Sequence, residues 1–199
     1  MLKITPERPP RQEAGVIRHL PNVISALRIL LVAPLMLALL SRRHETALVI
    51  AAVAGVSDGV DGYLARRCGW QSRLGSILDP VADKLMLVCC MLGLAWLGEA
   101  PVWMVALVVA RDAVIALGAL AWRGVLGRFD AEPSLVSKAT TVAQIGFVLL
   151  VLAAQAFGWH VPMQMPVWTV ALLTAASGLD YIVRWGLRAQ RALHGGRCA

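Results

Sequence analysis

Six apolar stretches, each close to the length of a membrane span, restrict the fold of this chain more than any other feature. An α-helix needs about 20 mostly apolar residues to cross the hydrocarbon core of a bilayer. Hydrophobic residues make up 58% of the 199 residues and charged residues 16%, against about 45–50% and about 25% in soluble domains. We therefore predict an all-α integral membrane protein with six transmembrane helices, over residues 23–40, 45–66, 74–97, 101–122, 137–158 and 165–187.

The segments that flank these stretches are polar. We expect the N-terminal one to end in a short amphipathic surface helix, because Ile17 and Leu20 can face lipid while Arg18 faces water. The predicted organisation is a cytoplasmic N-terminal segment, one six-helix domain and a basic cytoplasmic tail, over residues 1–20, 21–190 and 191–199.

Lysine and arginine are distributed unequally between the connections. They occur in the N-terminal segment, in the second–third and fourth–fifth connections and in the tail, whereas the opposite side has only Arg42 and Arg43. Because cytoplasmic loops are enriched in these residues, we expect both termini to face the cytoplasm, as in a bacterial-type inner membrane. These loops account for the net charge of +7, so we expect no nucleic-acid partner.

A polar stretch, residues 58–84, interrupts the apolar pattern with four aspartates: Asp58, Asp61, Asp79 and Asp83. A carboxylate at membrane depth costs a few kcal/mol or more, so this group needs compensating cations. The spacing puts each pair on one face of its helix, and two antiparallel helices can bring the pairs together. Oxygen ligands without histidine or cysteine select Mg²⁺ or Mn²⁺. Four carboxylates suit two such ions about 3.5–4 Å apart, as in phosphoryl transfer.

The residues between the aspartates suit a phosphate-bearing ligand. Gly62 and Gly75 allow close approach of the backbone, Ala65 leaves space, and Arg66 can bind two phosphate oxygens at once. The alternatives are solvated loop aspartates, a metal-ion transporter and a non-catalytic membrane scaffold. A transporter is expected to place its carboxylates near the midplane in repeated halves. The combined pattern D-x2-D-G-x2-A-R-x8-G-x3-D-x3-D instead favours a metal-dependent phosphoryl-transfer site at the cytoplasmic end of one helical hairpin.

This pattern resembles the signature of the CDP-alcohol phosphatidyltransferase family. The resemblance implies a six-helix membrane enzyme, usually a homodimer, that transfers a phosphatidyl or similar group from a CDP-linked donor to an alcohol and releases CMP. It implies that Asp83 is both a shared metal ligand and the general base. The remaining metal ligands would be Asp58, Asp61 and Asp79, and the CDP site would be lined by Gly62, Ala65, Arg66 and Gly75.

Three further motifs resemble the glycerol-lipid branch of that family. They are PNVISALR at residues 21–28, LDPVADK at residues 78–84, and the Arg111–Asp112 pair. Adjacent residues of a helix do not face each other. We therefore expect Arg111 to bind a phosphate on the acceptor rather than Asp112.

The stretch SKATT, residues 137–141, bears on the identity of the acceptor. Phosphatidylglycerolphosphate synthases tend to have GKxKT here. Lys138 keeps the first lysine of that form, but Ser137 and Thr140 replace the glycine and the second lysine. The stretch resembles instead the SKxNT form of the family's cardiolipin synthases, with Thr140 in place of the asparagine. We therefore expect CDP-diacylglycerol as donor and phosphatidylglycerol as acceptor, bound by Arg111 and Lys138. Glycerol 3-phosphate is the first alternative, followed by inositol phosphate, serine and choline-type acceptors.

Overall fold

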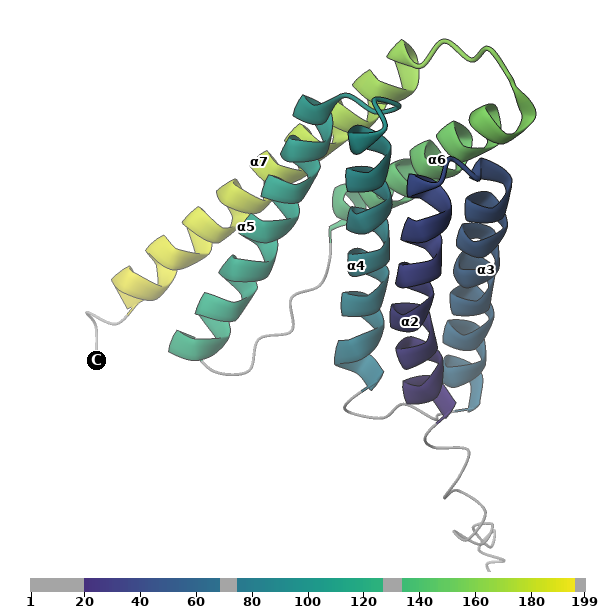
Figure 1. Cartoon of the computed structure of the whole chain (residues 1–199). Coiled ribbons are helices and arrows are strands. Elements are labelled where there is room, and N and C mark those ends of the chain that lie inside the picture. The colour runs from purple at the N-terminus through teal and green to yellow at the C-terminus, as the bar shows by residue number, and fades with distance from the viewer. Residues whose placement is uncertain (1–19, 69–74, 127–133, 196–199) are drawn as a thin grey trace, which may run out of the picture.

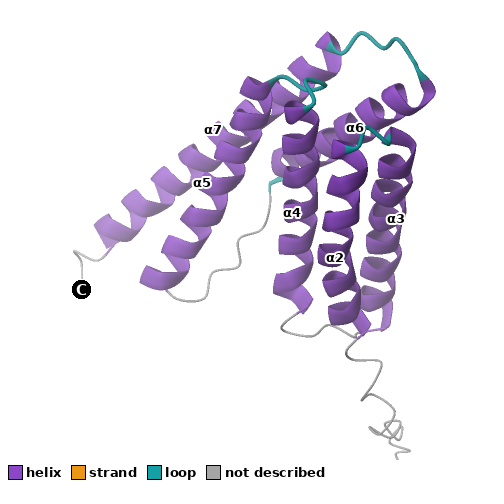
Figure 2. Cartoon of the chain, in the orientation of Figure 1, coloured by secondary structure: helices purple, strands orange, loops and turns teal. Residues whose placement is uncertain are grey.

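The computed structural model describes residues 20–68, 75–126 and 134–195, with side chains for residues 27–57, 81–118 and 134–184. The described residues form six α-helices and no strand (Figure 1, Figure 2). These helices are α2 (Leu20–Leu40), α3 (His44–Cys68), α4 (Gly75–Trp96), α5 (Val102–Leu126), α6 (Leu135–Phe157) and α7 (Gln164–Gly195).

Each helix covers one of the six predicted apolar stretches, so the prediction of an all-α fold with six helices is confirmed. The largest difference lies at the C-terminal end. There α7 continues to Gly195 and includes the start of the segment expected as a basic tail. The surface helix predicted within residues 1–20 falls almost wholly on residues 1–19, which lie outside the described part of the chain.

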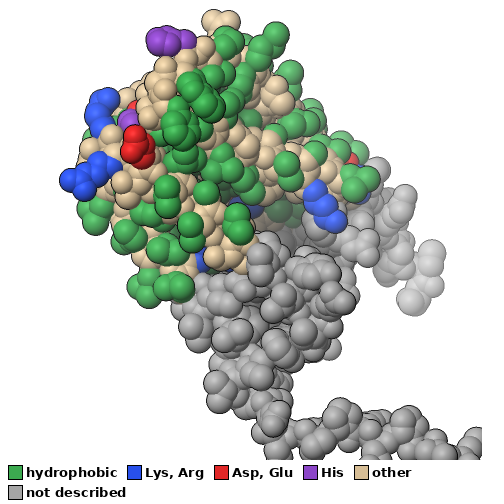
Figure 3. All heavy atoms as spheres, turned by 90° about the vertical axis from the view of Figure 1, so that its right-hand side faces the viewer, with side chains coloured by type: hydrophobic (Ala, Val, Ile, Leu, Met, Phe, Trp, Pro, Cys, Tyr) green, Lys and Arg blue, Asp and Glu red, His purple; other side chains and the backbone are tan. Residues whose placement is uncertain are grey.

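The outer surface of the described helices is apolar. Large hydrophobic side chains such as Leu37, Val53 and Leu172 are more than half exposed, and hydrophobic side chains cover much of the described surface in Figure 3. Within the described residues, two segments are long and apolar enough to cross a bilayer, Leu135–Phe157 and Gln164–Arg184. Such a surface fits a lipid environment better than water.

Helix α2 packs against both α3 and α4 and lies between them (Figure 1). Helix α6 packs against α3 and α7, and α5 packs against α7. The core is formed by fully buried side chains of these helices, among them Leu35, Leu39, Met91, Leu94 and Leu152. The two halves of the predicted aspartate motif are therefore carried by helices on opposite sides of α2.

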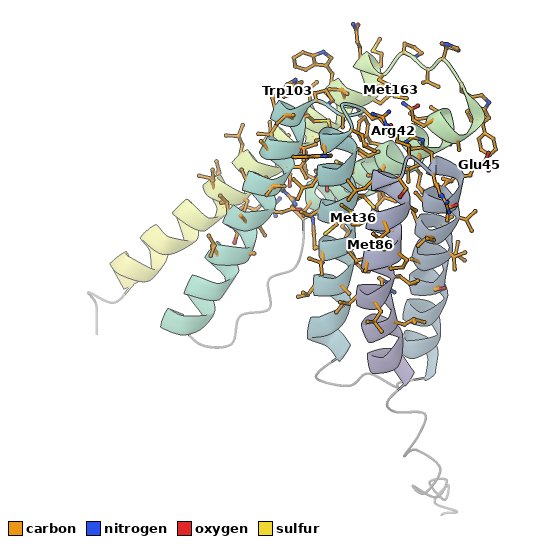
Figure 4. All side chains as sticks on the ribbon, viewed as in Figure 1. Met36, Arg42, Glu45, Met86, Trp103 and Met163 are labelled. Carbon is orange, nitrogen blue, oxygen red and sulfur yellow. The ribbon has the colours of Figure 1, made fainter. Side chains whose placement is uncertain are left out.

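Small residues allow the close contacts of α2 with its two neighbours. The face of α3 that is turned inward carries Ala47, Ala51 and Ala54, all buried. On α4, a Cβ placed at Gly93 would lie 3.4 Å from the Cε of Met36, a side chain of α2 seen in Figure 4. Small residues are common where helices meet in a bilayer, because van der Waals packing rather than the hydrophobic effect drives their association.

Helix α6 begins and ends at clear capping residues. Ser134 has an extended backbone, and its hydroxyl accepts a hydrogen bond from the amide of Ser137 at 3.2 Å. Gly158 follows the helix with φ 66° and ψ 28°, a left-handed conformation that glycine adopts without strain. The N-cap fixes the rotational position of the first turn of α6, which carries Ser137 into the bundle.

Three connections, between α2 and α3, between α4 and α5, and between α6 and α7, meet at one end of the molecule. Arg42, Glu45, Trp103 and Met163 mark this end in Figure 4. The opposite end holds the start of α2, the end of α3 and the start of α4 (Figure 1). The predicted aspartate motif belongs to this opposite end.

Candidate active site

Asp83 of α4 is the predicted site aspartate whose side chain the structure describes. It forms an ion pair with Arg28 of α2. The arginine side chain is only 5% exposed, whereas 43% of the aspartate side chain is accessible. The buried guanidinium therefore holds the carboxylate of a side chain that is itself partly accessible.

Asp83 borders a cavity of about 550 Å³ between α3, α4 and α6. The cavity lies beside Met86, which is labelled in Figure 4. Its wall has polar groups from Arg28, Asp83, Lys84 and Thr141; the rest is made by residues with little or no polarity, namely Ala51, Ala52, Ala54, Gly55, Val56, Met86, Leu87, Cys90, Ile145, Val148 and Leu149. A ligand with an apolar chain and a charged group is what such a wall can hold.

A second cluster of charges begins at the next residue of α4. The Lys84 ammonium lies 2.7 Å from one carboxylate oxygen of Asp112 on α5. The other oxygen of Asp112 accepts a hydrogen bond from Arg111 at 2.7 Å. One carboxylate therefore joins two cations that belong to different helices.

Arg111 also reaches the two C-terminal helices. Its second terminal nitrogen donates to the hydroxyl of Ser137 on α6 at 2.8 Å, and to the hydroxyl of Ser177 on α7. The side chain is 5% exposed, and its Nε is buried without a hydrogen-bond partner among the described atoms. Arg111 thus links α5 to α6 and α7, and its Nε–H group can donate to a further acceptor.

The expectation that Arg111 would not contact Asp112 is wrong. Adjacent Cβ atoms on a helix do point in different directions, but the arginine side chain is long enough for its guanidinium to turn back to the next carboxylate. The bonds to Asp112 and to Ser137 occur together, because they are made by different terminal nitrogens of Arg111.

Lys138 has a different environment from its neighbour Ser137. Its side chain is exposed, whereas Ser137 contacts Arg111. One turn further along α6, Thr140 is fully buried, and its hydroxyl shares its one hydrogen between carbonyl oxygens of α6 and α7 at 2.8 and 3.0 Å. The structure therefore brings Arg111 and Ser137 together and leaves Lys138 outside that cluster.

Several predicted site residues cannot be placed. Asp58, Asp61, Gly62, Ala65 and Arg66 fall within the range of α3, and Gly75 and Asp79 within that of α4, but their side chains lie outside the described residues. Their roles stay predictions.

Comparison with known proteins decides the family. A family model described as CDP-alcohol phosphatidyltransferase matches residues 18–179. The chain belongs to this family. The predicted resemblance and the predicted enzyme class, a CMP-forming phosphotransferase, are thereby confirmed.

Similar CDP-alcohol phosphatidyltransferases carry two kinds of name. A Mycobacterium tuberculosis protein named probable phosphatidylglycerophosphate synthase is 32% identical over 177 residues, which cover 84% of this chain and 82% of that protein. A Streptomyces coelicolor cardiolipin synthase (CMP-forming) is 35% identical over 159 residues, which cover 75% and 72%. A rice chloroplastic CDP-diacylglycerol–glycerol-3-phosphate 3-phosphatidyltransferase is 29% identical over 187 residues, which cover 84% and 57%.

CDP-alcohol phosphatidyltransferases generally use divalent metal ions, and the described part of the site fits such an ion. The carboxylate oxygens of Asp83 are hard donors, of the type that Mg²⁺ and Mn²⁺ prefer. The carboxylate opens onto the cavity where a substrate can reach it. Asp83 is thus suitably exposed to ligate a cation.

Sequence reasoning missed four participants in this site. In the sequence, Arg28 stands out only as the last residue of PNVISALR and Lys84 only as the last residue of LDPVADK. Ser137 and Ser177 carry no charge, and the sequence does not reveal which way they face on their helices. A signal did exist for Lys84 and Asp112, because two charged residues inside apolar stretches of a membrane protein commonly pair with each other.

Proposed function

We propose that the protein transfers the phosphatidyl group of CDP-diacylglycerol to a hydroxyl of a glycerol-type alcohol and releases CMP, in phosphatidylglycerol or cardiolipin synthesis. The observation that carries this proposal is that the carboxylate of Asp83 lies next to a cluster of cations. The accessible carboxylate of Asp83 adjoins Lys84, and Lys84 is joined through Asp112 to the buried Arg111. A base beside an anion-binding group suits an acceptor that has both a hydroxyl and a phosphate.

In the proposed reaction, the acceptor oxygen bonds to the phosphorus that carries diacylglycerol. The bond from that phosphorus to the bridging oxygen of the pyrophosphate breaks, and CMP leaves with the oxygen. Asp83 takes the proton of the acceptor hydroxyl. Arg28 keeps the carboxylate oriented, since its guanidinium is buried between helices and is held by packing.

We propose a two-ion site for Mg²⁺ or Mn²⁺, formed by Asp83 with Asp58, Asp61 and Asp79. When bound, the ions supply positive charge to the pyrophosphate and favour loss of the acceptor's proton. The cytidine diphosphate would lie against Gly62, Ala65, Arg66 and Gly75.

The apolar wall of the cavity supports a lipid substrate. The polar groups of Asp83 and Lys84 and the apolar groups of Leu87 and Val148 line the same space. A charged headgroup at Asp83 would therefore continue into an acyl chain without leaving the cavity.

Phosphatidylglycerol is our preferred acceptor. In the described part of its pocket, the two cations Lys84 and Arg111 less the one anion Asp112 leave a single positive charge. That charge matches the one negative charge of a phosphodiester better than the charge of about −1.5 to −2 of a phosphomonoester. The SKATT stretch favours the same acceptor, and Ser137 contacts Arg111. Glycerol 3-phosphate is the alternative, favoured by the names of the M. tuberculosis and rice relatives.

We further propose that all six helices cross the membrane, that both termini and the Asp83 end face the cytoplasm, and that the enzyme is a homodimer. The apolar outer surface supports the first point. The second is supported by the lysine and arginine content of the connections. The exposed Trp96, Trp103, Trp159 and Trp168 mark the opposite end as a membrane interface.

Two parallel reactions test the proposed function. Purified protein with Mg²⁺ or Mn²⁺ and CDP-diacylglycerol receives either glycerol 3-phosphate or phosphatidylglycerol, and CMP and lipid products are measured. We expect CMP and cardiolipin with phosphatidylglycerol. Product only with glycerol 3-phosphate would replace the preferred acceptor by the alternative. Absence of CMP with every glycerol-type acceptor would contradict the enzymatic proposal for these lipids.

A further inference from the structure

We propose that Lys84 is the second cation of the acceptor's phosphate site, and that Asp112 is the positioning residue that holds Lys84 and Arg111 toward that phosphate. This inference rests on the proposed function, in which Arg111 binds an acceptor phosphate. It adds two residues to the site and gives a role to the carboxylate that joins them.

The geometry of Asp112 is that of a bridge. Each of its oxygens lies 2.7 Å from a different cation, Lys84 of α4 and Arg111 of α5. The Asp112 side chain is 12% exposed, so water screens these interactions little. Charged hydrogen bonds of this kind contribute about 1.5–3 kcal/mol each, enough to hold Lys84 in place and to add to the orientation of Arg111.

The cluster of Lys84, Asp112 and Arg111 has an uncompensated charge and an unused hydrogen-bond donor. Two cations and one carboxylate leave one positive charge, and Arg111 and Asp112 are largely shielded from water. The Nε–H group of Arg111 is buried and bonds to no described atom, and a buried donor without a partner costs about 1–3 kcal/mol. An anion with several oxygens would correct both deficits, and a phosphate is such an anion.

Lys84 connects this cluster to the reaction centre. Its side chain is 38% exposed and lines the same cavity as Asp83. A phosphate bound by Lys84 and Arg111 would therefore bring its attached glycerol close to the proposed base. Lys138, by contrast, is exposed and forms no ion pair among the described side chains.

Kinetics of four variants test the proposal. Asp112→Asn and Lys84→Met should each raise the acceptor KM about tenfold, equivalent to about 1.4 kcal/mol, with the donor KM changed less than twofold. Lys84→Arg should restore most of the lost affinity. The double variant should be little worse than the poorer single one, because the residues act as a unit.

Asp180→Asn is the matched control, since it makes the same substitution in an exposed ion pair with Arg184 on α7. It should leave both KM values unchanged. An unchanged or lower acceptor KM in Asp112→Asn, or a donor KM that rises in step, would overturn the proposal, because Asp112 would then be only a neutralising partner or a competitor of the acceptor.

A binding measurement separates this inference from the proposed reaction. A short-chain phosphatidylglycerol should raise the thermal unfolding temperature of wild-type protein and should do so less in Lys84→Met and Asp112→Asn. This comparison needs no turnover, and it uses two variants, so that one of them can still be compared if the other does not fold. Equal stabilisation of all three proteins, or none of the wild type, would refute the phosphate site even if CMP is released.

Discussion

Replacing Gly118 by alanine tests how far the approach of α5 to α7 sets the geometry of the acceptor site. A Cβ at this position would lie 2.8 Å from the Oη of Tyr181 and 3.3 Å from its Cε1. Carbon and oxygen atoms that are not bonded do not come so near, so the phenol must tilt or α5 must move. Either change disturbs the hydrogen bond of 3.2 Å that Tyr181 donates to the carbonyl of Ile115.

The size of the effect follows from three contributions. Loss of the Tyr181 hydrogen bond costs about 0.5–1.5 kcal/mol, and overpacking costs about 1–3 kcal/mol. Alanine regains about 1 kcal/mol through its higher helix propensity. We therefore expect Gly118→Ala to lower the free energy of unfolding by about 2 kcal/mol.

A double-mutant cycle with Tyr181→Phe tests whether the phenol hydroxyl causes the effect. Tyr181→Phe removes the atom that would lie 2.8 Å away and leaves 3.3 Å as the nearest approach. In that background the hydrogen bond is already lost, so Gly118→Ala should be nearly neutral. Unfolding can be followed by titration with a denaturing detergent. Gly146→Ala is the matched control, because nothing lies within 4 Å of a Cβ there.

The same variants link packing to function. Gly118 lies two turns, about 10 Å, along α5 from Arg111, and Tyr181 lies about one turn along α7 from Ser177. A wider gap between these helices should weaken the bond from Arg111 to Ser177 and raise the acceptor KM in Gly118→Ala. An equal loss of stability in both backgrounds would refute the reasoning, since the Tyr181 hydroxyl would then not limit the approach.

Three further outcomes are expected. Asp83→Asn should abolish CMP release while most nucleotide binding is kept; an active variant would show that Asp83 is not the base. Lys138→Ala should raise the acceptor KM more than the donor KM, but less than Arg111→Met does, because Lys138 is exposed; equal effects on both substrates would remove it from the acceptor pocket. Ser134→Ala should lower the free energy of unfolding by about 1 kcal/mol through loss of the α6 N-cap, and Ser134→Gly should cost only a few tenths; a similar loss in both would point away from capping.

The helices were predictable because each apolar stretch is itself the signal. The fully buried Leu35 and Met91 and the outward Leu37 belong to stretches that any hydropathy argument identifies. What could not be predicted was the rotation of each helix about its axis. The sequence places Ser137 and Lys138 side by side, yet only the serine turns toward Arg111.

The site was predictable to the extent that it is local in sequence. The family and the reaction class follow from the aspartate pattern, and comparison with known proteins confirms both. The partners of Asp83 and Arg111 are not local: Arg28 and Ser177 come from helices that are far away in the chain. Pairing across such distances depends on tertiary packing, and the Arg111–Asp112 contact shows that even a neighbour rule fails for a long side chain.

Helix α2 lies between α3 and α4 (Figure 1), so the aspartate motif depends on a helix outside residues 58–84. Although residues 58–84 are continuous in sequence, the helices that carry them need a third helix as a spacer and as the source of Arg28. A hairpin of α3 and α4 transplanted into another membrane protein would therefore lack both. Because α2 precedes the motif in the chain, it is already synthesised when the motif emerges, and the spacer is available from the first moment at which the two halves can assemble.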